Sequence, residues 1–334
     1  MKIFKEKRNF RPLNKQGLII LSFLFFCSLI TYFCNIFYFQ DIPLVTTFNS
    51  LTSKEILFKY FYTPTLLMVA GIGLSVVGFS LQAINKNQLA SPSMMGIYPI
   101  TVFAFLILQI TKNNSLITYL GFFLAILFCS ILLLINYYFQ TKNTGKFTEK
   151  PLLFGFGLGV VFSGINLVLA SYVKNENISF VQLISNSVVY YSVDNFVISL
   201  VLITLSTVTL FIINKHINIM DIEFKYARVV GVRVNLIYFL VSLCAILISV
   251  STVLSLGSIS LIATIMPFFS RLIFKKQNYM IKNIGAGLIA NIFLQLNGIL
   301  VEFFLSINLV FLVASFLAIP LIFLVRYQIR RKFF

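Results

Sequence analysis

Apolar runs of about 20 residues recur along the whole chain, separated by short segments that hold most of its charged residues. A helix of about 20 residues crosses the roughly 30 Å hydrocarbon core of a bilayer. Since only 10% of the residues are charged, against about a quarter in soluble domains, a soluble globule is excluded. We predict an all-α membrane protein with about ten transmembrane helices, at residues 18–39, 62–84, 95–111, 116–139, 151–173, 195–214, 234–255, 258–274, 283–304 and 307–325.

The basic residues indicate how these spans are oriented. If the basic N-terminus lies inside the cell, 22 of the 26 Lys and Arg residues fall on the cytoplasmic side. Cytoplasmic loops of membrane proteins are rich in Lys and Arg, so both termini are expected in the cytoplasm. The chain then consists of a basic segment (1–17), a transmembrane domain (18–325) and a basic tail (326–334).

The charge distribution and the missing motifs disfavour several classes of function. The net charge of +17 does not indicate nucleic-acid binding, because the cations lie between spans and form no stripe with stacking aromatic residues. The sequence has no phosphate-binding G-x-x-x-x-G-K-[ST] motif, no catalytic Ser/His/Asp set and no Cys/His metal spacing, and its one histidine, His216, falls in a cytoplasmic loop. We expect no catalysis, cofactor or metal in this chain.

An ion-driven carrier is disfavoured as well, because such carriers place ionisable groups near the middle of the membrane. The predicted spans hold almost no charge. Glu302, at the outer end of the ninth span, is interpreted as an interfacial anchor, with a place at a substrate entrance as the alternative. The long outer segment 174–194 is either a surface-lying helix or a plain loop.

Residues 71–96, GIGLSVVGFSLQAINKNQLASPSMMG, combine small residues with a polar interruption. Gly71, Ser75 and Gly78 are spaced four and three residues apart, which puts them on one helix face where a neighbouring helix can approach closely. The apolar pattern stops at 85–88, and Pro92 can open a helix but cannot continue one. We predict a buried helix, a short polar turn and a second helix that starts after Pro92.

This stretch resembles the signature of the membrane permeases of ABC importers for iron-siderophore, haem and cobalamin, G-x-x-L-A-x-x-G-x-x-x-Q-x-x-x-R-N-P-L-A-x-P-x-x-L-G. The matching residues are Gly71, Leu74, Gly78, Gln82, Asn87, Leu89, Ala90, Pro92 and Gly96. Ser75, Lys86, Gln88 and Met95 replace the family's Ala, Arg, Pro and Leu. The alternative interpretation is an ordinary pair of membrane helices joined by a polar turn.

Residues 215–233, KHINIMDIEFKYARVVGVR, are the longest polar segment predicted on the cytoplasmic side after the N-terminus. Asp221 and Glu223 come early and Arg228 comes late, a charge order that suits the dipole of a short helix, which Gly231 would stop. A cytosolic partner would dock here.

The resemblance implies which partner this is. In the family, the pattern L-G-E-E-x-A-x-x-L-G lies between the sixth and seventh spans and forms coupling helices that insert into the ATPase. Ala227 and Gly231 match this pattern, whereas Phe224 and Lys225 stand in place of its paired glutamates. The resemblance therefore implies ATPase docking without the family's acidic pair.

Residues 257–271, GSISLIATIMPFFSR, resemble the family's G-P-I-x-F-x-G-L-x-x-P-H-x-x-R, and Pro267 predicts a kink in that span, functional or passive. A permease driven by a separate ATPase needs a pathway of small and weakly polar groups. The run Gly155, Gly157 and Gly159 serves lining or packing equally well. The residues predicted for the translocation pathway or for helix packing are Gly71, Ser75, Gly78, Gln82, Asn87, Pro92, Gly96, Ser163 and Pro267.

Similarity over most of residues 62–325 implies the architecture of a type II ABC importer permease in a bacterial cell membrane. It implies a second permease subunit, identical or paralogous, cytosolic ATPases that bind the ATP, and an extracellular binding protein that delivers ferric siderophore, haem or cobalamin. Lys54 and Lys59 are hypothesised to replace the family's outer arginines in docking that protein. The alternative from another class is a multispanning sensor or assembly protein that transports nothing.

Overall fold

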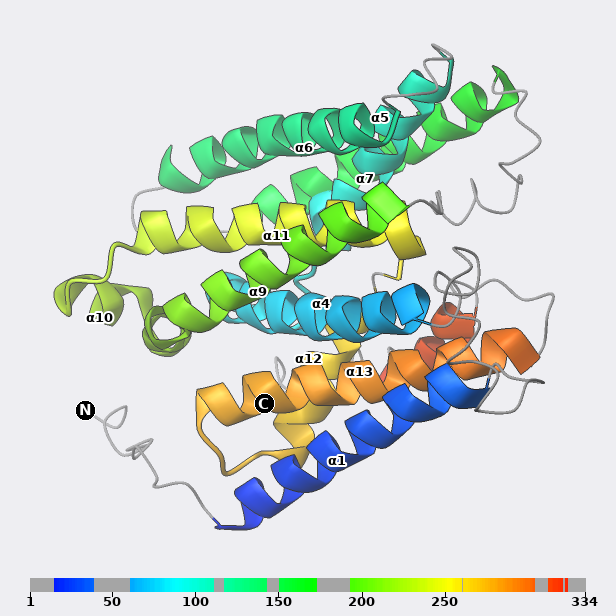
Figure 1. Ribbon diagram of the computed structural model, residues 1–334. Coiled ribbons are helices and arrows are strands. Elements are labelled where there is room, and N and C mark those ends of the chain that lie inside the picture. The colour runs from blue at the N-terminus through cyan, green and yellow to red at the C-terminus, as the bar shows by residue number, and fades with distance from the viewer. Residues whose placement is uncertain are drawn as a thin grey trace.

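Long helices lie side by side and run between two ends of the molecule in the computed structural model (Figure 1). The structure describes residues 15–38, 61–110, 117–142, 150–172, 193–259, 261–303, 312–320 and 322–323. Its long helices are α1 (Lys15–Tyr38), α4 (Thr63–Asn85), α6 (Ile117–Lys142), α7 (Lys150–Tyr172), α9 (Val193–Ile222), α11 (Val234–Leu256) and α13 (Tyr279–Phe303). The shorter ones are η3 (Ser93–Met95), α5 (Ile97–Ile110), α10 (Phe224–Val229), α12 (Leu261–Ile273) and a helix over 312–320.

Each of the ten predicted spans contains a helix. Within the described residues, seven helices are long and apolar enough to cross a membrane, α5 and α12 are apolar but shorter, and the helix at 312–320 falls in the tenth predicted span. No residue in the described part of the chain belongs to a strand. The predicted all-α membrane fold is therefore confirmed.

Contacts between helix ends show which ends share a side. Lys86, just after α4, contacts Asp221 in the last turn of α9. Asn283 near the start of α13 donates a hydrogen bond to Asn214 of α9 over 3.3 Å, and Gly17 at the start of α1 lies against Gln277 just before α13. The start of α1 therefore lies on the same side as α10.

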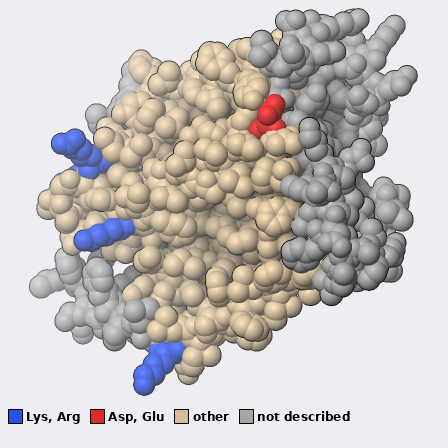
Figure 2. Space-filling model, viewed as in Figure 1, with Lys and Arg blue, Asp and Glu red and all other residues tan. Residues whose placement is uncertain are grey.

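Charge identifies this side as the cytoplasm. On the face shown in Figure 2, the Lys and Arg atoms of the described residues gather at the end that carries α10 in Figure 1, and the middle of the molecule shows none. Because basic residues mark the cytoplasmic ends of spans, α10 and the start of α1 are cytoplasmic. The predicted orientation is thus supported by the structure.

The core of the molecule is built around α4. It packs against α9, α11, α12 and α13. Of the residues in its most apolar stretch 83% are buried, compared with 11% for α1 at the edge of the molecule. In Figure 1, α5, α6 and α7 lie beyond α11 on one side of α4, while α13 and α1 lie on the other. The helix that carries the motif of residues 71–96 is therefore surrounded by the chain's own helices.

Two helix boundaries differ in detail from the predicted spans. A helical segment begins after Pro92 as predicted, but it is the short η3, and Gly96, at φ 74°, separates η3 from α5. The helix that contains the sixth predicted span continues past residue 214 to Ile222, so α9 carries part of the predicted polar segment. In both places local backbone geometry set the boundary where hydropathy did not.

Some predictions fall on residues outside the described part of the chain. These are the basic segment over residues 1–14, the docking residues Lys54 and Lys59, most of the outer segment 174–194, and the tail 326–334.

Candidate functional site

The cytoplasmic helix α10 ends in a motif that fixes its orientation. Gly231 has φ 85°, its backbone N–H donates to the Arg228 carbonyl over 3.1 Å, and the N–H of Val232 donates to the Ala227 carbonyl over 2.9 Å. This pair of hydrogen bonds is a Schellman motif, which needs a residue in the left-handed region where glycine is unstrained. Ala227 and Val232 are both buried, so the motif pins one face of α10 to the molecule.

The other face of α10 is exposed and apolar. Val229 is 85% exposed, and large apolar side chains beside it are about half exposed: Ile222, Tyr226 and Val230. We call these four residues the coupling patch. Isolated exposed apolar residues are common, but several of them on a cytoplasmic helix and at its two ends mark a surface that a protein partner can cover.

The charged residues predicted for coupling occupy different positions around this patch. Asp221 lies in the last turn of α9 and Glu223 in the break between α9 and α10, where its side chain makes no capping hydrogen bond to α10. The predicted short helix is α10, which has Glu223 as its N-cap residue, whereas Asp221 precedes it on α9. Arg228 is exposed near the end of α10, where its charge suits the helix dipole as predicted.

Lys86 connects the 71–96 stretch to this cytoplasmic region. It caps α4 in the left-handed conformation, at φ 53°, and no other non-glycine residue in the described ranges has a positive φ. Its ammonium group donates to the backbone carbonyl of Asp221 and lies 5.3 Å from the ring centroid of Phe224. Sequence reasoning noted Lys86 as the single cation of its turn but missed its contact with the coupling segment.

Gly71 and Gly78 allow close helix packing, but against two helices and not the single neighbour that was predicted. A Cβ atom at Gly78 would lie 2.6 Å from the carbonyl carbon of Ala263 on α12, and one at Gly71 would lie 3.2 Å from the backbone of Ala290 on α13. Ser75, between them, is fully buried. The small residues of α4 therefore sit at contacts inside the subunit.

Pro267 explains why α12 can come so close to α4. Proline has no N–H, so the Ala263 carbonyl, four residues earlier, lacks its usual helical donor. Gly78 packs directly on this carbonyl. Next to it, Gln82 donates a hydrogen bond from its side-chain amide to the Thr264 carbonyl over 2.9 Å. Pro267 on α12 and the motif residues Gly78 and Gln82 on α4 thus meet at one contact between the two helices.

A second glycine contact joins η3 to α7. A Cβ atom at Gly155 would lie 2.8 Å from the Met95 carbonyl oxygen, and one at Gly159 would lie 3.2 Å from the Cα of Gly96. Asn166, further along α7, donates to the Pro99 carbonyl over 2.8 Å. Gly155 and Gly159 therefore pack, whereas Gly157 of the same run has no atom within 4 Å of its would-be Cβ.

The opposite face of α7 is open. Only 22% of the residues in the apolar stretch Leu153–Ala170 of α7 are buried, and Val160, Val161 and Val168 are each more than half exposed. Gly164, like Gly157, faces open space, and Ser163 is half-buried beside them. Among the residues predicted for a pathway, Ser163 thus borders a free surface. Pro92 and Gly96 are buried, and Asn87 is half-buried and accepts a hydrogen bond from the backbone of Leu89 over 3.0 Å.

A buried amide cluster at the outer ends of three helices was missed from the sequence. Gln295 of α13 donates to the Pro64 carbonyl of α4 over 2.8 Å, and it accepts a hydrogen bond from Asn35 of α1. Asparagine or glutamine inside a predicted span was the available signal, because such amides seek partners on neighbouring helices.

The sequence of this chain is similar to that of known transport proteins. The profile of the FecCD transport family matches residues 19–327. The Bacillus subtilis (strain 168) protein named "Probable siderophore transport system permease protein YfiZ" is 26% identical over 237 residues, which cover 68% of this chain and 69% of that protein. The iron(3+)-hydroxamate import system permease protein FhuG of the same organism is 24% identical over 281 residues, 77% of this chain and 81% of FhuG.

A solved metal-chelate type ABC transporter in an inward-facing conformation has the same fold. It superposes with a TM-score of 0.73 at 22% sequence identity and covers 93% of this chain and 99% of the matched chain. The helix order and packing described above therefore match the fold of that solved chain.

Proposed function

The chain belongs to the FecCD transport family, and we propose that it is the permease subunit of an ABC importer that carries a ferric siderophore across the bacterial cell membrane. The observation that carries this proposal is the family match from residue 19 to residue 327, which includes every described helix apart from the first turn of α1. The names of the two Bacillus subtilis relatives, a siderophore permease and a hydroxamate permease, favour an iron chelate as cargo.

In this proposal the coupling patch is the surface that the ATPase covers. The patch is cytoplasmic, apolar and exposed, and the Schellman motif holds it in one orientation. ATP is bound by the ATPase subunits, and this chain contributes no cofactor site. Movement of α10 would reach the membrane domain through Lys86, because its side chain joins α10 to the end of α4.

A second permease subunit would cover the open face of α7. That face combines exposed apolar residues with Gly157, Ser163 and Gly164, a lining that lets a bulky chelate pass without strong binding. The partner is either a second copy of this chain or a paralogue. Burial of the α4 residues inside the subunit favours helix packing as their role, and in this proposal the pathway runs along α7.

An extracellular binding protein would deliver the chelate to the outer side. Lys54 and Lys59 are proposed to receive its acidic residues. Reversal of both charges is expected to abolish docking of the binding protein, measured by co-purification and by uptake, while ATPase binding at the cytoplasmic side is retained. Unchanged uptake would remove these two lysines from the proposal.

Uptake by a deletion strain tests the function as a whole. Cells without this chain are expected to lose accumulation of radiolabelled ferric siderophores, with ferric hydroxamates as the first probes, and to regain it with a plasmid copy. Haem and labelled cobalamin are measured in the same cells. Normal siderophore uptake in the deletion strain with loss of haem or cobalamin uptake would reassign the cargo. Loss of none of the three would contradict an importer.

A further inference from the structure

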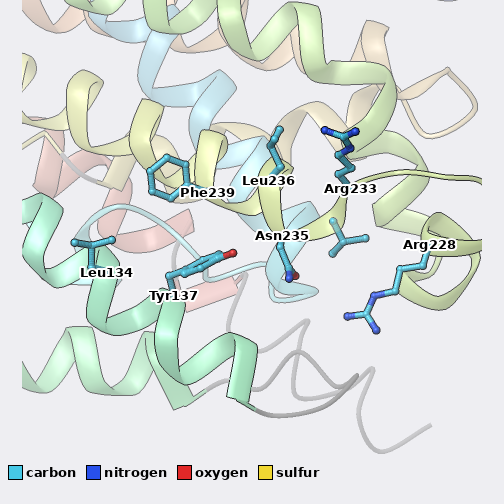
Figure 3. Close-up of a pocket in the computed structure, with 8 residues that line it drawn as sticks. Leu134, Tyr137, Arg228, Arg233, Asn235, Leu236 and Phe239 are labelled. Atoms are coloured by element: carbon cyan, nitrogen blue, oxygen red, sulfur yellow. The ribbon is translucent and has the colours of Figure 1, made fainter.

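A pocket of about 590 Å³ lies on the cytoplasmic side between the end of α6, the end of α10 and the start of α11 (Figure 3). Leu134 and Tyr137 come from α6 and Asn235 and Phe239 from α11, while Arg228 and Arg233 flank the loop between α10 and α11. In Figure 3 the Tyr137 hydroxyl points toward Asn235, and the Arg228 side chain reaches toward the same space. The coupling patch does not include any of these residues.

The electrostatics of the pocket select for an anion. Arg228 and Arg233 are both exposed, and the described residues that line the pocket include no carboxylate. Within the described part of the chain neither guanidinium forms an ion pair. Asn235 and Leu236 lie in the first turn of α11, whose backbone N–H groups have no acceptor within the helix, and the N-cap residue supplies none from its side chain. Two arginines and the first turn of a helix thus border one cavity.

The remaining walls are apolar and belong to membrane-spanning helices. Leu134 is 57% exposed and Leu236 is 46% exposed. Tyr137 and Phe239 are half-buried, and their rings lie edge to face with centroids 6.1 Å apart. On α6, Ile131 and Tyr138 continue the exposed apolar surface from the pocket along the helix. A ligand with an anionic head at the arginines and an apolar body along α6 would satisfy both parts of this site.

We propose that this pocket binds the phosphate head group of an anionic phospholipid from the inner leaflet, with its acyl chains along Leu134 and Leu236. Basic pockets at the cytoplasmic ends of membrane helices are suited to such head groups. A zwitterionic phospholipid fits less well, because none of the lining residues that the structure describes is a carboxylate that could receive its cation. The site would tie the loop between α10 and α11 to the membrane surface, beside the helix that carries the coupling patch.

Native mass spectrometry and thermal unfolding of the purified full chain test the proposal with phosphatidylglycerol as the probe. Two arginines near a membrane surface each contribute roughly 1 kcal/mol to anionic lipid binding, so Arg228→Gln/Arg233→Gln should weaken retention of one phosphatidylglycerol about thirtyfold. It should also abolish the rise in melting temperature that this lipid produces. Lys225→Gln, an exposed cation on α10 outside the pocket, is the matched control and should retain both effects.

Further measurements distinguish a bound lipid from a free anion and keep the test valid if the double variant does not fold. Phosphatidylcholine and inorganic phosphate should produce no shift, and an equal shift with phosphate would replace the lipid by a free anion. If the double variant does not fold, a photoactivatable phosphatidylglycerol is applied to the unmodified protein. Labelling of peptides that contain Tyr137 or Leu236 is expected, and labelling confined to other peptides would overturn the proposal, as would lipid retention by a folded double variant.

Discussion

The ammonium group of Lys86 donates a hydrogen bond to the backbone carbonyl of Asp221, so the end of α4 is joined to the end of α9 across 135 positions of sequence. The same lysine faces the ring of Phe224 at 5.3 Å, and Phe224 is the first residue of α10. One side chain thus connects α4, the most buried of the seven long helices, with the cytoplasmic helix that carries the coupling patch. This contact gives the first prediction.

Replacement Lys86→Gln is expected to reduce siderophore uptake several-fold without loss of ATPase binding, because it shortens the side chain and removes the charge that contacts the Asp221 carbonyl and the Phe224 ring. Uptake assays and co-purification of the ATPase measure the two effects separately. Lys86→Arg should retain most activity. Lys215→Gln, which changes another exposed lysine on the cytoplasmic side, is the control, and an equal loss in both variants would refute a specific role for Lys86.

Replacement Val229→Asp is expected to weaken ATPase binding by about tenfold or more, because a carboxylate would have to be desolvated in an apolar interface. Val229 is 85% exposed in this subunit, so folding of the permease should be unaffected by the replacement. Co-purification of the ATPase and the melting temperature of the permease are the measurements. Val229→Leu should preserve binding, and retained binding by the aspartate variant would exclude the coupling patch as the docking surface.

Replacement Gly78→Ala is expected to destabilise the permease by about 1–3 kcal/mol, because the added methyl group would overlap the Ala263 carbonyl, which is backbone and cannot move aside alone. A lower melting temperature in detergent is the expected result. Gly121→Ala is the matched control, since its nearest atoms are side chains at 3.4 Å or more. Equal melting temperatures for both variants would contradict the close contact between α4 and α12.

Replacement Gln295→Leu is expected to cost about 1 kcal/mol of stability, because it removes the hydrogen bond to the Pro64 carbonyl and the acceptor that Asn35 uses. The fall in melting temperature should be accompanied by faster proteolysis between α1 and α4, since the cluster holds these helices on α13. Leu296→Ala, at a position that is 47% exposed, should have a smaller effect. A variant as stable as the unmodified chain would show that the cluster does not hold α1.

Much of this architecture follows from local sequence. Apolar runs separated by basic segments predicted the ten helices and the cytoplasmic side, because both depend on transfer into lipid and on charge. Gly231 was correctly expected to end α10, since its position needs a positive φ. The continuation of α9 to Ile222 was not predicted, because a helix can leave the membrane without breaking, and hydropathy reports the membrane boundary and not the helix boundary.

The roles of the small residues required the tertiary structure. Gly155, Gly157 and Gly159 form one run in sequence, yet Gly155 and Gly159 touch η3 while Gly157 faces open space, because a helix turns about 100° per residue and only the neighbours decide which face is covered. Lys86 likewise reads as a solvated cation until folding brings Asp221 beside it. The sequence by itself determined a ten-span membrane protein of fixed orientation, since solvation acts on each segment separately. Which residues pack, which line open surface and which join the membrane domain to α10 was decided by contacts between distant segments, and these exist only in the folded chain.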